Sequence, residues 1–429
     1  MTLGPGIGDA FFGFGLAGLA IAYMQRRAPP ALVPLGAAAI FAFAEWLRAE
    51  GLGVLGVPFG SLGYSQVDSP FAPLGAFVGT YGITFVLATI GAYAAYAIRA
   101  QFARPALTAA ATAYLCVVVA TALAWYAWPA KTYAAPTFPV AAVQGNIAQS
   151  LKFTPGAYRT ALARYTTLTL GLARAHPRLI VWPETVIIKA LGVGPADMYQ
   201  PADVHDALAL QQRFGDLAKR VGAELVVGSF DVRAGKLYNA LFFFRPDGGL
   251  DAVYHKRQLV PFAEHTPGRQ FLGWIPWTAN ISKIEEGDSS GVIDVGGAHI
   301  GPIVCWESAF SGLVVGDVRD GASALLIATD DAWFGTTAGP YQHAQIARMR
   351  AIETGRWIVR SASTGISGII APDGRYVTST RLNVATVVTG AIGAPVPTFY
   401  DAVGPSRVAL AFLILCGGIV LWPRRLARR

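Results

Sequence analysis

Long apolar segments dominate the first 130 residues and return near the end of the chain. Five of them have the length and apolar character to span a bilayer: residues 10–25, 31–47, 69–98, 105–129 and 408–423. Because a span needs about 20 apolar residues, the first and last are short, and Arg407 would have to extend to the membrane interface. A single short run could equally be a buried core helix. Five such runs flanked by arginines favour membrane spans.

Between residues 136 and 400 the pattern changes to short apolar strands that alternate with amphipathic helices. Strands are predicted at residues 139–144, 178–182, 224–230, 237–244, 252–255, 299–304, 324–329 and 357–361. Helices are predicted at residues 157–175, 205–221 and 341–354. The Pro246-Asp247-Gly248-Gly249 turn joins two of the strands as a hairpin. This alternation predicts an α/β domain.

Composition supports a membrane-bound chain. Of 429 residues, 53% are hydrophobic and only 14% are charged, which is too few charges to cover a soluble surface. Residues 136–401 hold 23 Lys/Arg and 22 Asp/Glu, a balanced surface; the totals of 34 and 26 leave 11 basic and 4 acidic residues beside the apolar segments. That distribution is typical of membrane flanks, so we expect a membrane partner and no nucleic acid.

The basic residues also predict an orientation. The loops after the first and third segments carry Arg26, Arg27, Arg99 and Arg104, and the tail carries four arginines. Placing these on the cytoplasmic side puts residues 131–406 outside and the C-terminus inside. We therefore expect a transmembrane helical domain of about four spans at 1–130, a catalytic domain at 131–402 and a final span with a basic tail at 403–429. No cleavable signal peptide is evident, so the first span would act as an anchor.

Metal and cofactor chemistry find no support in the sequence. The three cysteines are unclustered and the six histidines are scattered, without an H-E-x-x-H pair. We expect neither a metal nor a cofactor.

Three predicted strands end on side chains with complementary chemistry. Glu184 follows the strand at 178–182, Lys256 follows the strand at 252–255, and Cys305 follows the strand at 299–304. In α/β sheets, functional side chains gather beyond the carboxyl ends of strands. A carboxylate there could take the thiol proton, and an ammonium could lower the thiol pKa and stabilise an oxyanion. Taken separately, a buried core cysteine, a capping glutamate and an exposed lysine are equally good interpretations.

The surrounding motifs resemble the carbon–nitrogen hydrolase (nitrilase) superfamily, and most closely its membrane-bound branch, the apolipoprotein N-acyltransferases. The matching segments lie in the expected order over nearly the whole chain. They are Glu45-Trp46-Leu47-Arg48, Leu62-Gly63-Tyr64-Ser65-Gln66, Val143-Gln144-Gly145-Asn146, Trp182-Pro183-Glu184, Lys256 with 259–264, Val304-Cys305-Trp306-Glu307, Asp330-Asp331-Ala332-Trp333-Phe334-Gly335, Gln342-His343 and 347–351.

The resemblance implies a nitrilase-like αββα sandwich attached to an α-helical transmembrane domain, in a bacterial inner membrane with the catalytic domain on the periplasmic side. It implies that Glu184 is the general base, Lys256 the oxyanion-stabilising amine and Cys305 the nucleophile. It assigns supporting roles to Glu264, Trp306 and Glu307. Substrate contacts are expected from side chains in matching or apolar aromatic segments: Trp333, Phe334, Asn239, Trp274 and Trp277. For an aromatic cluster, ordinary core packing is a comparable alternative.

The implied reaction moves an acyl chain from a phospholipid, through a thioester, to the N-terminal amine of a diacylglyceryl-cysteine lipoprotein. Two alternatives remain open at this point: a membrane-anchored amidase or nitrilase in which water attacks the thioester, and a conjugal-transfer membrane protein with altered or vestigial chemistry. The family pattern leads us to expect two or more further membrane helices before the point where this sequence begins. The chain also has Ala263 where glycine is usual and Trp306 where tyrosine is usual.

Overall fold

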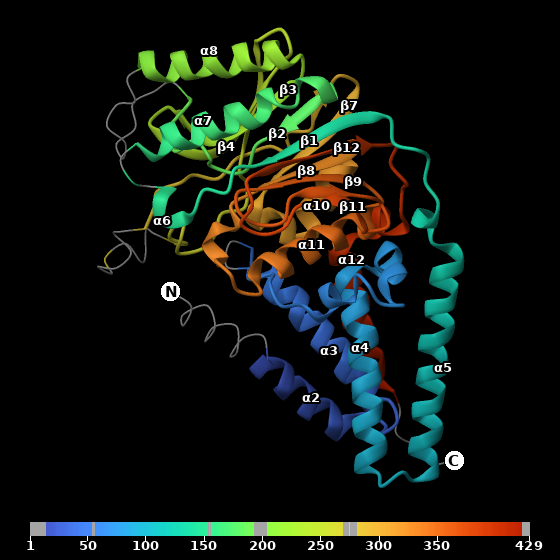
Figure 1. Cartoon of the computed structure of the whole chain (residues 1–429). Coiled ribbons are helices and arrows are strands. Elements are labelled where there is room, and N and C mark those ends of the chain that lie inside the picture. The colour runs from blue at the N-terminus through green and yellow to red at the C-terminus, as the bar shows by residue number, and fades with distance from the viewer. Residues whose placement is uncertain are drawn as a thin grey trace.

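The computed structural model describes residues 14–53, 56–152, 154, 156–192, 204–268, 274 and 281–422 (Figure 1). A two-sheet domain occupies one part of the molecule, and long helices extend from it on one side. The two parts agree with the predicted fold class, an α/β domain attached to apolar helices.

Two six-stranded sheets form the centre of the catalytic domain. The first sheet has the order β12 (Thr386–Ile392), β1 (Phe138–Gln144), β2 (Leu179–Val181), β3 (Glu224–Arg233), β4 (Lys236–Phe244), β5 (Leu250–His255). The second has the order β11 (Tyr376–Ser379), β10 (Gly368–Ile370), β9 (Trp357–Ala362), β8 (Ala324–Thr329), β7 (Ala298–Val304), β6 (Ile293–Val295). All eight predicted strands are present, and the hairpin at 246–249 joins β4 to β5. The prediction missed the short strands β6, β10 and β11 and the edge strand β12.

Four layers confirm the predicted αββα sandwich. One apolar cluster joins the facing sides of the two sheets. A second cluster joins the first sheet to the helices on its outer side, and a third does the same for the second sheet. The outer helices are α7 (Ala157–Leu170) and α8 (Val204–Val221) on the first sheet, and α10 (Ser311–Arg319) and α11 (Gly339–Thr354) on the second. Central strands are therefore buried on both faces, which explains their continuous apolar runs. Helix α10 is the one layer helix that the sequence pattern did not predict.

Strand direction brings the three predicted functional ends together. Strands β2 and β3 run parallel, and the two antiparallel steps from β3 to β4 and from β4 to β5 restore that direction. The carboxyl ends of β2 and β5 therefore lie at the same edge of the first sheet. In the second sheet, β7 and β8 are parallel, so the residues after both also emerge together.

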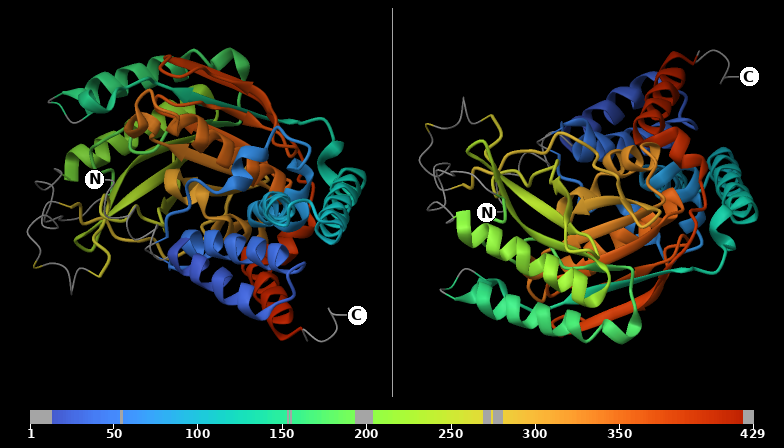
Figure 2. Two further views of the ribbon diagram at one scale, coloured as in Figure 1. Left: turned by 90° about the horizontal axis from the view of Figure 1, so that it is seen from below. Right: turned by 90° about the horizontal axis from the view of Figure 1, so that it is seen from above.

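Three described helices are long and apolar enough to cross a membrane: Ala72–Arg99, Arg104–Ala127 and Phe399–Leu421. They contain α4 (Gly75–Arg99), α5 (Arg104–Ala127) and α12 (Phe399–Leu421) and coincide with the third, fourth and fifth predicted spans. At the positions of the first two, α2 (Leu16–Arg27) has 12 residues and α3 (Val33–Trp46) has 14 before a short π-helix, Leu47–Gly51. Residues 10–13 lie outside the described part, and the first two spans stay predictions. Figure 2 shows these helices on one side of the sandwich.

A buried polar network joins the membrane helices to the catalytic domain. Glu353 on α11 accepts hydrogen bonds from the backbone N–H and hydroxyl of Thr80 on α4, both at 2.7 Å, and from Ser311 at the start of α10 at 2.9 Å. Arg350 pairs with Glu353 at 3.0 Å, and both side chains are fully buried. Because a buried charge is stable only when it is paired and hydrogen-bonded, this network holds the two domains in one arrangement.

Gly79 allows α4 and α12 to approach closely at this junction. Its backbone has φ +64° and ψ −171°, a conformation that residues other than glycine rarely adopt. Helix α4 is kinked at this residue. A Cβ atom at this position would lie 2.3 Å from the ring of Tyr400 on α12. Glycine is therefore required here for both backbone conformation and space.

Replacing Gly79 with alanine is expected to destabilise the protein by roughly 3 kcal/mol, because backbone strain and the overlap with Tyr400 add. The measurement is thermal unfolding in detergent micelles. Gly91→Ala, in the same helix but with no atom within 4 Å of the added Cβ, is the matched control and should be neutral or slightly stabilising. Equal melting temperatures for the two variants would contradict this account of Gly79.

Candidate active site

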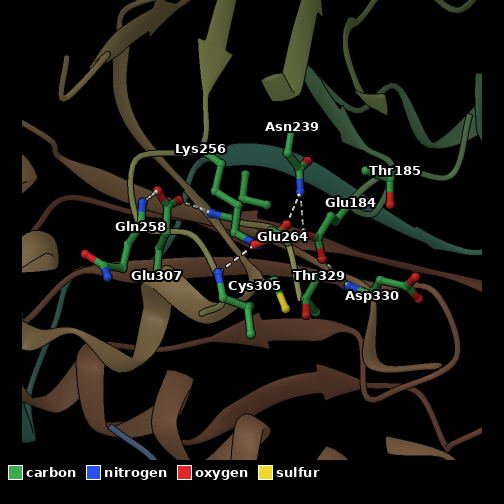
Figure 3. Close-up of polar contacts among 12 residues, drawn as sticks. Glu184, Thr185, Asn239, Lys256, Gln258, Glu264, Cys305, Glu307, Thr329 and Asp330 are labelled. Carbon is green, nitrogen blue, oxygen red and sulfur yellow. Dashed lines mark hydrogen bonds and ion pairs between the residues drawn. The ribbon is translucent and has the colours of Figure 1, made fainter. Parts of the chain in front are cut away.

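Lys256 lies between two carboxylates at the edge where β2 and β5 end (Figure 3). Its Nζ is 3.0 Å from Glu184 Oε1 and 2.9 Å from Glu264 Oε2. The lysine side chain is 1% exposed. Burial acts against its charge, but Glu184 and Glu264 outweigh burial, and the pKa of Lys256 is raised well above its usual value. The amine is therefore a fixed ammonium that can donate hydrogen bonds without releasing a proton.

Glu184 is held at both carboxylate oxygens. Its Oε1 accepts from the side-chain amide of Asn239 at 2.8 Å as well as from Lys256, and its Oε2 accepts from the backbone N–H of Asp330 at 2.9 Å. The same Asn239 amide donates to Glu264 Oε1 at 3.0 Å. The sequence grouped Asn239 with the substrate contacts, whereas the structure places its amide between the two carboxylates. We assign it a positioning role.

Cys305 forms the turn at the end of β7, where the strand passes into a short 3₁₀-helix, Cys305–Ala309. Its backbone has φ +50°, in the left-handed region that a cysteine rarely adopts. The Cys305 carbonyl oxygen accepts from the Ser308 hydroxyl at 2.8 Å and lies 3.1 Å from His343 Nε2. These contacts hold the strained turn and place the thiol at the strand end.

His343 is itself anchored in a buried ion network. Its Nδ1 is 2.8 Å from Asp331 Oδ1, and Asp331 Oδ2 pairs with Arg360 at 2.8 Å. Although burial acts against the charge, Arg360 and His343 hold the pKa of the Asp331 carboxyl well below its usual range. Asp331 is therefore ionised, and its contact with Nδ1 fixes the orientation of the His343 imidazole next to Cys305.

The thiol of Cys305 is a neutral group at rest. Burial and the neighbouring Glu184 carboxylate raise its pKa well above the usual value, and the opposing effects of Lys256 and of a hydrogen bond with Thr329 are smaller. Lys256 thus lowers the thiol pKa, as predicted, but burial and Glu184 outweigh its effect. In Figure 3 the sulfur lies beside Thr329, close to Glu184 and Lys256. A base is needed to ionise it, and Glu184 is the carboxylate in place.

Glu307 ties the nucleophile turn to the lysine loop. One of its oxygens accepts from the Val304 N–H at 2.6 Å, and the other accepts from the N–H groups of Arg257 at 2.6 Å and Gln258 at 3.2 Å. The Tyr254 hydroxyl contacts both oxygens at 2.9 Å. Glu307 is fully buried, so these bonds fix how Cys305 sits relative to Lys256.

The aromatic side chains that were predicted to contact substrate differ in how exposed they are. Trp306 and Phe334 are half-buried near Cys305, whereas Trp333 is 70% exposed and Trp274 is 80% exposed. Trp277 lies outside the described residues. The structure therefore brings only Trp306 and Phe334 into ring packing next to the nucleophile, and the rings are joined by Phe59.

Sequence reasoning missed several residues of the site. Lys152 pairs with Asp330 at 2.5 Å and donates to Thr185 at 2.7 Å, so it holds together the segments that contact Glu184 or follow it. Thr329 was hidden inside an apolar strand, and Phe59 comes from the loop after α3. The signal for Lys152 and Asp330 was the polar pair Asp330-Asp331 directly after a buried strand. Among the described residues no group of three or more His, Cys, Asp or Glu side chains could hold a metal ion.

Comparison with known proteins identifies related sequences over both parts of the chain. Residues 139–395 match the carbon–nitrogen hydrolase family, and residues 9–93 match the apolipoprotein N-acyltransferase N-terminal domain. An apolipoprotein N-acyltransferase of Pseudomonas syringae pv. tomato is 32% identical over 82% of this chain and 67% of its own length. Those of Bradyrhizobium diazoefficiens and Rhodopseudomonas palustris are each 31% identical, over 92% and 94% of this chain and 74% and 76% of theirs.

Solved structures that are similar to part of this chain include two proteins of other organisms. Nit3 of Saccharomyces cerevisiae, a member of the nitrilase superfamily, has a TM-score of 0.46 at 19% identity, covering 68% of this chain and 97% of that one. An amidase from Nesterenkonia has a TM-score of 0.46 at 16% identity, covering 65% and 98%. The family match over 139–395, the N-terminal match and the identities above 30% over most of the chain agree with the motifs around the three strand ends. This chain belongs to the apolipoprotein N-acyltransferase family, the membrane-bound branch of the carbon–nitrogen hydrolases.

Proposed function

We propose that this chain is a membrane-bound N-acyltransferase that takes an acyl chain from a phospholipid and transfers it to the N-terminal amine of a diacylglyceryl-cysteine lipoprotein. The observation that carries the proposal is the Lys256 ammonium, buried between Glu184 and Glu264 beside the Cys305 thiol, in a domain joined at both ends to apolar helices. Its relatives carry the name of this activity.

In the first half-reaction, Glu184 takes the thiol proton and the Cys305 sulfur attacks the ester carbonyl of the lipid. A carbon–sulfur bond forms, and negative charge moves to the carbonyl oxygen. The Lys256 ammonium and the backbone N–H of Trp306 stabilise that oxyanion. The carbon–oxygen bond then breaks, and Glu184 passes the proton to the leaving alkoxide, which departs as a lysophospholipid.

In the second half-reaction, the free amine of the lipoprotein attacks the thioester. A carbon–nitrogen bond forms, the carbon–sulfur bond breaks, and a proton from the amine returns through Glu184 to the sulfur. The product is an amide, and the thiol is restored. Because two substrates use one nucleophile in turn, the kinetics should be ping-pong.

We propose the same placement that the basic residues predict: a bacterial inner membrane, the catalytic domain at 131–402 on the periplasmic side, helical parts at 1–130 and 403–429 and the C-terminus in the cytoplasm. Short connections support the tether. Helix α5 ends at Ala127 before β1 begins at Phe138, and β12 ends at Ile392 before α12 begins at Phe399. A catalytic domain held this closely can reach only substrates at the bilayer surface.

The hydrolase and conjugal-transfer alternatives are not favoured by the comparisons, since a match to the acyltransferase N-terminal domain accompanies the hydrolase fold. The deciding experiment follows the mass of the intact protein in detergent micelles. Phosphatidylethanolamine should add one acyl group to Cys305, and a synthetic diacylglyceryl-cysteine peptide should then remove it as an acylated peptide. Release of free fatty acid without peptide acylation would instead establish a hydrolase, and the lack of any adduct would exclude acyl chemistry at Cys305.

A further inference from the structure

The Glu45-Trp46-Leu47-Arg48 segment at the end of α3 anchors a loop that the mechanism above does not use. The Arg48 guanidinium donates to the carbonyl oxygens of Val57 and Phe59, the latter at 2.8 Å. Glu45 accepts from the Leu62 N–H at 3.2 Å and from the Thr84 hydroxyl at 2.7 Å. Both charged side chains are buried, at 6% and 3% exposed. We refer to residues 57–62 as the anchored loop.

Two buried charges give this loop a defined position. Removing the Arg48 guanidinium from water is costly unless it forms hydrogen bonds, and the carbonyl oxygens of Val57 and Phe59 in the anchored loop accept from it. The loop cannot move away without leaving Arg48 and Glu45 buried without those partners. Hydrogen bonds from the membrane domain therefore help to set the conformation of this loop.

The anchored loop carries Phe59 onto the residues beside the nucleophile. The Phe59 ring stacks on Trp306 with centroids 5.2 Å apart and planes 16° apart. It also lies 5.8 Å from the Phe334 ring and 5.7 Å from the His343 ring. Trp306 directly follows Cys305, and His343 lies under the Cys305 carbonyl. A side chain from the membrane domain thus completes an aromatic cluster of Phe59, Trp306 and Phe334 next to the thiol.

The three rings of the cluster are half-buried, so part of each remains open to a ligand. They are uncharged, and they lie where the loop from α3 to α4 meets the end of β7. A ligand covalently held on Cys305 that packs on this cluster must be apolar next to its carbonyl group. An extended acyl chain fits this requirement, and burying each CH₂ against such rings is favourable.

We propose that Phe59, positioned by Arg48, is a specificity-determining residue that packs against the acyl chain held on Cys305 and selects long-chain donors. This inference rests on the proposed function, because it concerns the acyl group of that reaction. Phe59 takes no part in proton transfer or oxyanion binding. Its loss should therefore weaken the reaction with long chains and spare the reaction with donors too short to reach the cluster.

The test compares two acyl donors on the full-length protein in detergent micelles, with acylation of Cys305 followed by intact mass. For Phe59→Ala we expect the acylation rate with a long-chain phosphatidylethanolamine to fall about tenfold, the range that loss of apolar pocket contacts produces. The rate with p-nitrophenyl acetate should stay within about twofold of wild type, since the triad is unchanged. Arg48→Met should shift the ratio of the two rates in the same direction, because Phe59 loses its tether. Phe71→Ala is the matched control. Phe71 and Phe59 both pack against the apolar cluster that contains Leu74 and Met349, but Phe71 lies on its α4–α5 side and should leave the ratio unchanged.

Each outcome decides the inference. A tenfold change in the ratio for Phe59→Ala, but not for Phe71→Ala, supports it. Equal losses with both donors would show that Phe59 only stabilises the fold, and an unchanged ratio would show that the acyl chain does not pack there; either overturns it. These failures differ from failure of the proposed function, in which wild-type protein would form no acyl adduct with either donor and the inference would fall with it.

Discussion

Cys305→Ser is expected to abolish acyl-enzyme formation, with a loss of at least about a thousandfold in the rate of acyl transfer. The hydroxyl that replaces the thiol is a far weaker acid, and a carboxylate at the position of Glu184 cannot ionise it. Burial, which already raises the pKa of the Cys305 thiol, would act against an alkoxide even more strongly. The measurement is the intact mass after incubation with phospholipid, together with transfer to a diacylglyceryl-cysteine peptide.

The chain supplies its own controls for this variant. Cys116 lies exposed on α5 and Cys416 lies half-buried on α12, both far in sequence from the strand ends that build the site. Cys116→Ser and Cys416→Ser should keep the acyl adduct at wild-type levels. Full transfer activity in Cys305→Ser, or an adduct that maps to another residue, would refute the proposed mechanism.

Glu184→Gln is expected to change two reactions of the same thiol in opposite directions. Acylation by phospholipid should fall by about 10²–10⁴-fold, because the general base is lost. Alkylation by iodoacetamide should become faster at a given pH, because that reagent needs only the thiolate and no base. The Glu184 carboxylate contributes to the raised pKa of Cys305, so a neutral glutamine lowers that pKa and increases the thiolate fraction.

The pH profile makes the sign of this effect measurable. As the thiol pKa falls, the midpoint of the alkylation rate against pH should move to lower pH, by roughly one pH unit for each tenfold gain in rate. Peptide mass mapping separates Cys305 from the other two cysteines. Glu285→Gln, which changes an exposed glutamate whose side chain is 49% accessible, is the control and should leave both reactions unchanged. A midpoint that stays in place or rises would contradict the electrostatic assignment, and unchanged acylation would contradict the role of Glu184 as base.

Most of the sandwich could be predicted from local pattern because its central strands are buried on both faces. Strands such as β1 and β8 appear in the sequence as continuous apolar runs, and each was predicted to within a residue. The short strands β10 and β11 were missed because three or four residues carry too little pattern to stand out. Helix α10 was missed because its sequence, Ser311–Arg319, mixes small and apolar residues without a long polar face.

Some residues of the candidate site could be predicted from the sequence and others could not. Glu184, Lys256 and Cys305 could be found because each follows an apolar strand. The shared direction of β2 and β5 in one sheet, and the packing of the second sheet with β7 against it, then bring the three ends together. Their partners could not be found so easily. Asn239 was grouped with the substrate contacts, because the sequence does not show that its amide lies between two carboxylates. Asp330 contacts Glu184 through its backbone N–H, which no side-chain motif records. The neutral state of the Cys305 thiol depends on burial, which only the packed structure reveals.

The apolar helices, the α/β alternation and the three strand ends could all be predicted, since they follow from residue periodicity and local order. How the two parts meet depends on contacts between distant residues: Glu353 contacts Thr80 across a separation of 273 residues, and Phe59 stacks on Trp306 from a different domain. Such contacts depend on chain folding in space and leave no periodic signal. The surface that meets the acyl chain is therefore set by packing between domains, whereas the reactive groups are set by the ends of individual strands.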